Sequence, residues 1–241
     1  MTSSAPSTKR VAIVQSCYIP WKGYFDLIHR VDEFILYDDV QYTKRDWRNR
    51  NQIKTANGLA WLSIPVDVKG KYLQAIKDTT VSDRNWAARH WKTVQASYAR
   101  AAHFREYKQV IEDLFRGCGA TRLSEINHHF LSRICRMLEI STPLTWSMDY
   151  AYDRESGKTE SLVDLCRRAG ATAYLSGPSA RAYLDPAVFA AAGISLSFME
   201  YQGYPEYPQP YPPFEHHVSI LDVILNTGPA ARSCTLPLVL K

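Results

Sequence analysis

Two short apolar runs lie within the first 40 residues, with a loop and a helical pattern between them. Residues 11–14 and 33–37 each have the length and composition of a buried strand. The apolar residues of segment 24–31 fall on one face of a helix. A strand, a helix and a second strand in this order favour a parallel pair, because parallel strands need a crossover. We therefore predict an α/β fold with a layered sheet, begun by this β-α-β unit.

The middle of the chain changes from a hairpin pattern to a helical one. Residues 52–55 and 59–66 are strand-like on either side of Ala56-Asn57-Gly58, and Asn-Gly is the strongest short hairpin signal. From Asp83, a suitable N-cap, apolar residues then recur at helical spacing. This pattern predicts a helical insertion at about residues 83–140.

The last third returns to alternation between helix and strand. Residues 160–169 are helical in pattern, and residues 173–175 and 194–199 are strand-like. Residues 201–214 are rich in Tyr and Pro and are predicted to run as a rigid extended loop, because proline cannot donate to a central sheet. We expect a disordered tail at residues 1–10 and a single α/β domain over residues 11–241, in which the second α/β segment completes the sheet.

The composition of the chain bears on its location in the cell and on the partners that it can bind. No window approaches the ~18 consecutive apolar residues of a membrane-spanning helix, and residues 1–10 lack a signal-peptide pattern, so we predict a cytoplasmic protein without membrane contact. The net charge of +5 suits an acidic partner, but no uninterrupted basic run points to nucleic acid. The five cysteines are odd in number and lack C-x-x-C spacing, which predicts reduced thiols and no metal site.

Polar and reactive side chains follow both strands of the first unit. Gln15 and Cys17 come after the first strand, and Asp38 and Asp39 come after the second. The carboxyl ends of parallel strands meet at one edge of a sheet, where ligands bind. Cys17 is a candidate nucleophile if a helix N-terminus or a cation lowers its pKa, with a small buried filler as the alternative. Asp39 is the candidate that orients a histidine, and a turn-forming aspartate pair is the alternative.

Residues 41–51 form a polar segment that lacks hydrophobic periodicity. They combine cations, amides and aromatic rings, among them Lys44, Trp47, Arg50 and Asn51. Arginine can clamp a carboxylate or phosphate with two hydrogen bonds, and Trp offers a stacking surface. We expect these four residues to bind an anionic or amide-bearing substrate, with a solvated, salt-bridged connection as the alternative.

Three further candidates lie in the last third. His216 precedes the final predicted helix and is preferred over His217 as a general base, although caps and surface positions are common for such histidines. Ser176 opens a Ser-Gly-Pro-Ser turn that could hold a phosphate or be an ordinary β-to-α turn. Ser176 and Tyr201, with Gln15, complete the predicted substrate-binding set.

Several motifs carry a resemblance to a known family. They are Val11-Ala-Ile-Val-Gln-Ser-Cys-Tyr-Ile-Pro-Trp-Lys-Gly-Tyr-Phe-Asp-Leu-Ile28, Tyr37-Asp-Asp-Val-Gln-Tyr42, Trp47-Arg-Asn-Arg-Asn51, Tyr174-Leu-Ser-Gly-Pro178, Tyr183-Leu-Asp185 and Ser219-Ile-Leu-Asp222. Together they resemble the WbqC-like family over nearly the whole chain. The positions that match its pattern are Gln15, Pro20, Gly23, Tyr24, Asp39, Gln41, Trp47, Asn49, Arg50 and Asn51, whereas Cys17 departs from it.

The resemblance implies a biosynthetic role. Members of this family occur among genes for O-antigen and other surface sugars, where a glycine-transferring role has been suggested, and beside secondary-metabolite genes. An acyl or aminoacyl transferase that forms an amide bond would unite these settings.

The leading prediction is ATP-independent transfer from a carrier-protein thioester to a small-molecule amine. The expected partners are an acyl or peptidyl carrier protein and the amine, and the expected cofactor is none beyond the donor's phosphopantetheine arm. Cys17 would attack the thioester, His216 would take the proton and Asp39 would orient His216. Arg50 with Asn51 or Gln15 would stabilise the oxyanion. The alternatives are a nucleotide-dependent ligase of the nucleotidylyltransferase-like kind and a non-catalytic module that binds a carrier.

Overall fold

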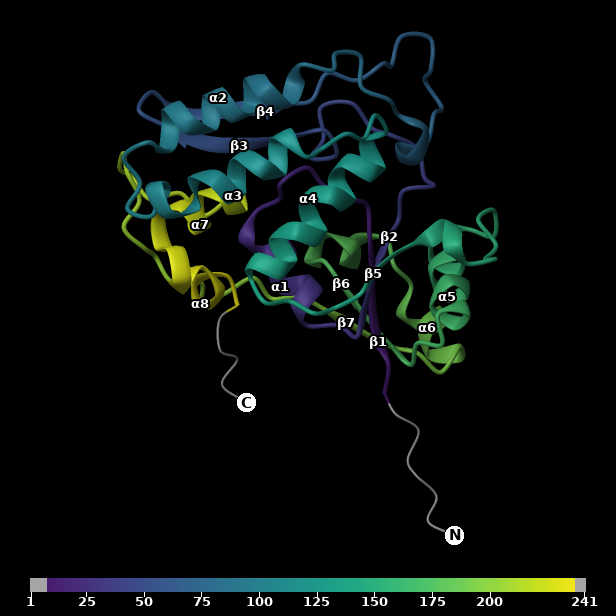
Figure 1. Cartoon of the computed structure of the whole chain (residues 1–241). Helices are drawn as coiled ribbons and strands as arrows, with labels where there is room; N and C mark the ends of the chain where they lie inside the picture. The colour runs from purple at the N-terminus through teal and green to yellow at the C-terminus, as the bar shows by residue number, and fades with distance from the viewer. Residues whose placement is uncertain (1–7, 237–241) are drawn as a thin grey trace. The chain divides into compact units, whose positions relative to one another are not determined.

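The computed structural model describes residues 8–236 (Figure 1). These residues divide into two compact units. Within the described residues, the first unit comprises the chain up to Gln15, Leu27–Tyr37 and Thr142–Tyr201. The second unit comprises Ser16–Asp26, Asp38–Ser141 and the chain from Gln202 onward. The prediction of a single domain over residues 11–241 stays a prediction.

Two residues of the predicted N-terminal tail are part of the first unit. Residues 1–7 of that tail lie outside the described residues. Arg10 already belongs to strand β1, and the Lys9 backbone N–H donates to Thr172 Oγ1 at 3.1 Å. The tail prediction is therefore wrong for Lys9 and Arg10, because both are tied to the first unit by main-chain hydrogen bonds.

The first unit contains a parallel sheet of five strands in the order β5-β2-β1-β6-β7. The strands are β1 (Arg10–Val14), β2 (Glu33–Leu36), β5 (Leu144–Trp146), β6 (Ala173–Ser176) and β7 (Ser195–Phe198). The predicted neighbours β1 and β2 pair in parallel, with Ala12 opposite Phe34. The α/β class is confirmed, and the strand order is that of a doubly wound sheet.

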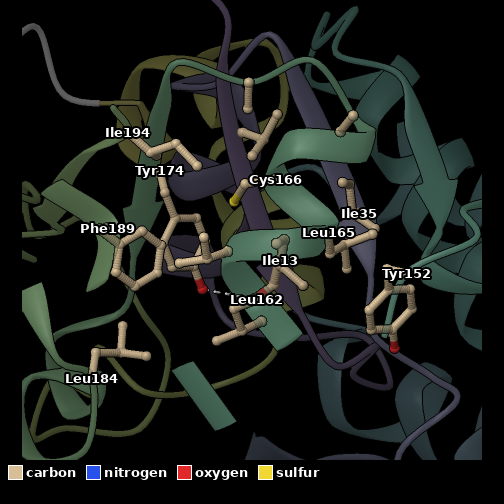
Figure 2. Packing of buried hydrophobic residues seen from close by; sticks show 14 of the residues in the cluster. Ile13, Ile35, Tyr152, Leu162, Leu165, Cys166, Tyr174, Leu184, Phe189 and Ile194 are labelled. Atoms are coloured by element: carbon tan, nitrogen blue, oxygen red, sulfur yellow. Dashed lines mark hydrogen bonds between the residues drawn. The ribbon is translucent and has the colours of Figure 1, made fainter. Parts of the chain in front are cut away.

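Helices α5 (Lys158–Arg168) and α6 (Pro186–Ala191) cover one face of this sheet (Figure 1). Figure 2 shows Leu165 and Cys166 of α5 over Ile13. The rings of Tyr174 and Phe189 stack with centroids 5.3 Å apart. This core explains the near-continuous apolar character of β1 and β2, whose faces are both buried.

The second unit contains the predicted hairpin and the predicted helical segment. Strands β3 (Arg50–Thr55) and β4 (Gly58–Ser63) pair antiparallel, and Gly58 takes a positive φ of 96° at the turn. The helices are α2 (Trp86–Tyr98), α3 (Phe104–Arg116), α4 (Leu123–Met137), α7 (Ile220–Thr227) and α8 (Ala231–Thr235). Helix α1 (Lys22–His29) begins in this unit and its last turn belongs to the first.

Short 3₁₀ helices and one long irregular loop complete the chain. The 3₁₀ helices are η1 (Ile76–Asp78), η2 (Ser147–Asp149), η3 (Pro178–Ala182) and η4 (Gly228–Ala230). Residues 201–214 contain no helix or strand, as predicted for the Tyr/Pro-rich segment. Among residues 8–236 no helix combines the length and apolar character that crossing a membrane requires.

Candidate functional site

A buried polar network surrounds Asp38 in the second unit. Asp38 is fully buried, and its carboxylate accepts hydrogen bonds from the Ser16 backbone N–H, at 2.8 Å, and from the Ser124 hydroxyl. Asn127 Nδ2 donates to Ser16 Oγ and to the Arg48 carbonyl, each at 2.9 Å. Burial raises the pKa of Asp38, and the hydrogen bonds from Ser124 and Ser16 oppose that rise. The network fixes the loop that follows β1.

Cys17 lies beside this network in an environment that disfavours the thiolate. Its side chain is buried, and burial raises the pKa of the thiol to about 11, although the Arg48 charge acts in the opposite direction. Because the thiolate is the attacking form, a thiol with this pKa is a weak nucleophile at neutral pH. Of the two predicted aspartates, Asp38 is the buried one, and Asp39 is half-buried.

The arginines of the basic segment 41–51 differ in burial and in partners. Arg48 is buried, with its guanidinium 3.5 Å from the Asp46 carboxylate. Arg50 instead lies 4.0 Å over the ring of Trp61, which is 5.3 Å from the ring of Trp47. Both indole side chains are 42% exposed, which is unusual for Trp and indicates a contact surface.

Lys44 and Asn51, the other two predicted binding residues of this segment, differ in burial. Lys44 is exposed. Asn51 is buried, and its amide donates to the Tyr18 carbonyl at 3.1 Å, so its Nδ2 already has a main-chain acceptor. We name Lys44, Trp47, Arg50 and Trp61 the aromatic-basic surface.

A second buried cluster centres on Lys22, the first residue of α1. The Lys22 side chain is 1% exposed, and its ammonium lies 5.3, 5.4 and 5.6 Å from the ring centroids of Tyr204, Tyr207 and Phe214. Within residues 8–236, Lys22 Nζ has no hydrogen-bond partner. Burial lowers the pKa of Lys22 below its ordinary value of 10.5.

His216 adjoins the Lys22 cluster through a shared aromatic ring. Its imidazole centroid is 4.7 Å from that of Phe214, and its Nδ1 is buried without a hydrogen-bond partner in the described part of the chain. Burial first, and the Lys22 charge second, lower the pKa of His216 below 6.5. His216 is therefore neutral at pH 7, which is the form that accepts a proton.

The loop that supplies the three rings is anchored at several points in the second unit. Tyr204 donates to Asp26 at 2.7 Å, Tyr207 donates to Asp222 at 2.7 Å, and Lys54 Nζ donates to Gln209 at 2.6 Å. These bonds hold the Tyr/Pro loop over Lys22, and they account for its order without regular secondary structure.

Asp222 is the main internal anchor of that loop. The carboxylate is fully buried, and Oδ1 accepts from Tyr207, Gln209 and Asn226 while Oδ2 accepts from Tyr98 at 2.9 Å. Its oxygens are thus engaged by neutral donors, and its role is structural.

Two of the predicted site residues in the second unit, Cys17 and His216, have different charged neighbours. Charges of Arg48, Asp46 and Asp38 act on Cys17, whereas those of Lys22, Glu206, His217 and Glu215 act on His216. The two candidates for nucleophile and base thus have different electrostatic neighbours within the second unit.

The remaining predicted residues belong to the first unit. Gln15 follows β1 and is half-buried, as is Tyr201. Ser176 ends β6 and is buried, with its hydroxyl 3.3 Å from that of Tyr174. In the described residues no group of three or more His, Cys, Asp or Glu side chains could hold a metal ion.

Sequence reasoning missed Lys22, Ser124 and Asn127. The signal for Lys22 was a lysine placed directly before an otherwise apolar helix face, in Pro-Trp-Lys-Gly. No local signal marks Ser124 or Asn127, because Ser124 bonds to Asp38, 86 residues away, and Asn127 bonds to Ser16, 111 residues away.

Comparison with known proteins adds a family and a relative. The family model of the WbqC-like protein family matches residues 15–234. A Mycobacterium tuberculosis protein, uncharacterized protein Rv1507c, is 50% identical over 223 residues, which is 92% of this chain and 96% of that protein. No solved structure matches the chain.

Proposed function

The chain belongs to the WbqC-like protein family, and we propose that it is an amide-forming acyl or aminoacyl transferase that joins a carrier-bound thioester to an amine. The observation that carries the proposal is His216, a neutral imidazole whose buried Nδ1 has no partner in the described residues. Such a nitrogen is suited to take the proton of an attacking amine. O-antigen-like sugar or secondary-metabolite biosynthesis, in the cytoplasm, is the setting that we propose.

The proposed chemistry is direct transfer. The amine nitrogen attacks the thioester carbonyl, the C–N bond forms and the C–S bond breaks. His216 accepts the proton that the amine loses and returns it to the departing thiolate. The products are an amide and a free thiol, so no oxidant, reductant or nucleotide is needed.

Direct transfer replaces the covalent route through Cys17 as our preferred mechanism. The pKa of about 11 leaves Cys17 almost entirely as the thiol at neutral pH. Cys17 and Asp39 keep their candidate roles only in the covalent alternative.

The aromatic-basic surface supports the choice of a carrier-bound donor. Carrier proteins present an acidic surface and a phosphopantetheine arm, whose phosphate suits Lys44 and Arg50. The exposed rings of Trp47 and Trp61 offer apolar contact area beside these charges. Charge complementarity of this kind chiefly raises the rate of encounter.

A nucleotide-dependent ligase is the second candidate, and the strand order of the first unit favours it. In the order β5-β2-β1-β6-β7, the connections reverse direction between β1 and β6. Open α/β sheets bind ligands at this switch point, beyond the carboxyl ends of the strands. Ser176, at the end of β6, would then lie at the nucleotide rather than at the acyl donor.

The test is an assay with an acyl N-acetylcysteamine thioester, which mimics the end of the phosphopantetheine arm. The full-length chain, the thioester and a panel of amines are incubated with and without ATP, and release of free thiol is followed. We expect thiol release that depends on the amine but not on ATP, and its loss in His216→Gln, whereas His217→Gln retains it. Amide formation only with ATP, accompanied by pyrophosphate, would support the ligase instead.

A further inference from the structure

Lys22 is a buried cation whose ammonium hydrogen-bonds to no anion of the described chain. Its ammonium is surrounded by three aromatic rings and has no hydrogen-bond partner within residues 8–236. Buried ammonium groups are costly unless they are paired. An unpaired buried ammonium therefore indicates that its anionic partner is a ligand that binds to the protein.

The nearby carboxylates are engaged with other groups. Asp222 accepts four hydrogen bonds, all from neutral donors. Asp26 accepts from the Tyr204 hydroxyl, and Glu206 is exposed. The charges of Asp222 and Glu206 act on Lys22 without a hydrogen bond to its ammonium.

The position of Lys22 adds a second preference for negative charge. Lys22 begins α1, where the helix dipole and the first backbone N–H groups favour an anion. The next residue is Gly23, where a Cβ would lie 2.3 Å from the Trp21 indole. The centroid of the Trp21 ring lies 5.9 Å from that of Tyr204 and 5.0 Å from that of His217, so aromatic groups surround this end of the helix.

The proposed base, His216, lies near Lys22, so one ligand could meet both residues. Lys22 Nζ and the His216 ring both lie against Phe214, at 5.6 and 4.7 Å. A molecule that presents its amine to His216 would therefore place its adjacent substituent at Lys22. The substituent that a buried ammonium selects is an anionic one.

We propose that Lys22 binds a carboxylate or phosphate group of the acceptor, so that the acceptor is an amine that carries an acidic group close to its nitrogen. Amino acids and phosphorylated amines both have this chemistry. The inference rests on the proposed function for the role of the amine, but the anion site itself requires no turnover.

The test compares three small amines by calorimetric titration of the full-length chain. Glycine carries a carboxylate, O-phosphoethanolamine carries a phosphate, and ethanolamine carries no acidic group. We expect at least one of the acidic amines to bind about tenfold or more tightly than ethanolamine, as removal of a charged hydrogen bond implies. The acidic amine that binds identifies the group as carboxylate or phosphate.

Two variants locate the effect. Lys22→Met keeps the apolar stem and should abolish the preference for the acidic amine, while Lys92→Met, at an exposed position of α2, should retain it. Equal binding of all three amines by the wild type would overturn the proposal, as would a preference that persists in Lys22→Met.

A measurement on the wild type tests the anion site even if Lys22→Met does not fold. Trace acetylation followed by peptide mass mapping reports the reactivity of each lysine, and inorganic phosphate or acetate should slow acetylation of Lys22 but not of Lys92. No protection of Lys22 by either anion would also overturn the proposal. Anion binding without amide formation would refute the proposed function alone, and amide formation without acid preference would refute only the anion site.

Discussion

Replacement of Lys22 by methionine should stabilise the protein, although it should impair substrate binding. Methionine has nearly the length of the lysine stem and fills the same space among the three rings. The substitution removes a buried charge that has no hydrogen-bond partner in the described chain. Residues kept for binding at the expense of stability are a recognised feature of functional sites.

The size of the gain follows from two opposing contributions. Removing an ammonium from water costs several kcal/mol, even after the protein relaxes. The rings of Tyr204, Tyr207 and Phe214, at 5.3–5.6 Å, lie near the outer limit of cation–π attraction, so each returns about 0.5–1 kcal/mol. We therefore expect Lys22→Met to raise the free energy of unfolding by about 1–3 kcal/mol. For a chain of 241 residues, each kcal/mol raises Tm by about 2–4 °C.

The dependence on pH gives this prediction an internal check. Because burial lowers the folded-state pKa of Lys22 below 10.5, the unfolded chain binds more protons between these two pKa values. The stability contributed by Lys22 therefore rises with pH across that interval. The advantage of Lys22→Met over the wild type should shrink as pH approaches 10.5.

The assay is urea unfolding followed by Trp fluorescence, with calorimetric Tm as a second readout. Lys92→Met is the matched control and should change the unfolding free energy by no more than about 0.5 kcal/mol. A loss of stability of more than about 1 kcal/mol in Lys22→Met would show that Lys22 has a structural anionic partner, and the reasoning would fail.

Three further predictions concern the other candidates. Cys17→Ala should retain amide formation. In the wild type, alkylation of Cys17 should accelerate only as the pH approaches the thiol pKa of about 11. An acyl adduct on Cys17 in intact-mass spectra would contradict direct transfer. Asp38→Ala should lower the unfolding free energy by about 1–3 kcal/mol for each donor left without its acceptor. Asp38→Asn should lower it less, because the amide oxygen still accepts from Ser16. Equal losses of stability for the two variants in urea titrations would refute the role of Asp38 as a hydrogen-bond acceptor. Arg50→Ala should lower kcat/KM for a carrier-bound donor by the equivalent of ~1.5–3 kcal/mol, with little change in Tm. Arg50→Lys should restore little of this loss, because lysine lacks the planar guanidinium group. A lower Tm with unchanged kinetics would show that Arg50 has a structural role instead.

Much of the fold could be predicted because its signals are local. The apolar runs of β1 and β2, the Asn57-Gly58 turn and the helical periodicity after Asp83 each lie within one segment. Strand β5 was missed because Leu144–Trp146 is too short to show alternation. The order of the strands depends on pairings such as Val11 with Tyr174, which no local pattern encodes.

The candidate site was harder to predict, because burial there depends on distant parts of the sequence. The pattern after β2 indicated two aspartates, but the selection of Asp38 depends on Ser124, 86 residues away. Lys22 follows the apolar sequence Ile-Pro-Trp21, and the rings that surround its ammonium come from residues 204–214, far along the chain. Cys17 follows β1, which ends at Val14, but its pKa is set by burial, which the sequence does not show.

Amide formation from a loaded carrier protein is the most direct test of the central claim. A carrier bearing a glycyl thioester is mixed with the full-length chain and an isotope-labelled amine without ATP, and the labelled amide is quantified by mass spectrometry. We predict that labelled amide accumulates with the wild type and with Cys17→Ala, and falls to background with His216→Gln. No labelled amide above background from glycyl or acetyl carriers, with every acidic and neutral amine offered, would contradict assignment of this chain as an amide-forming transferase.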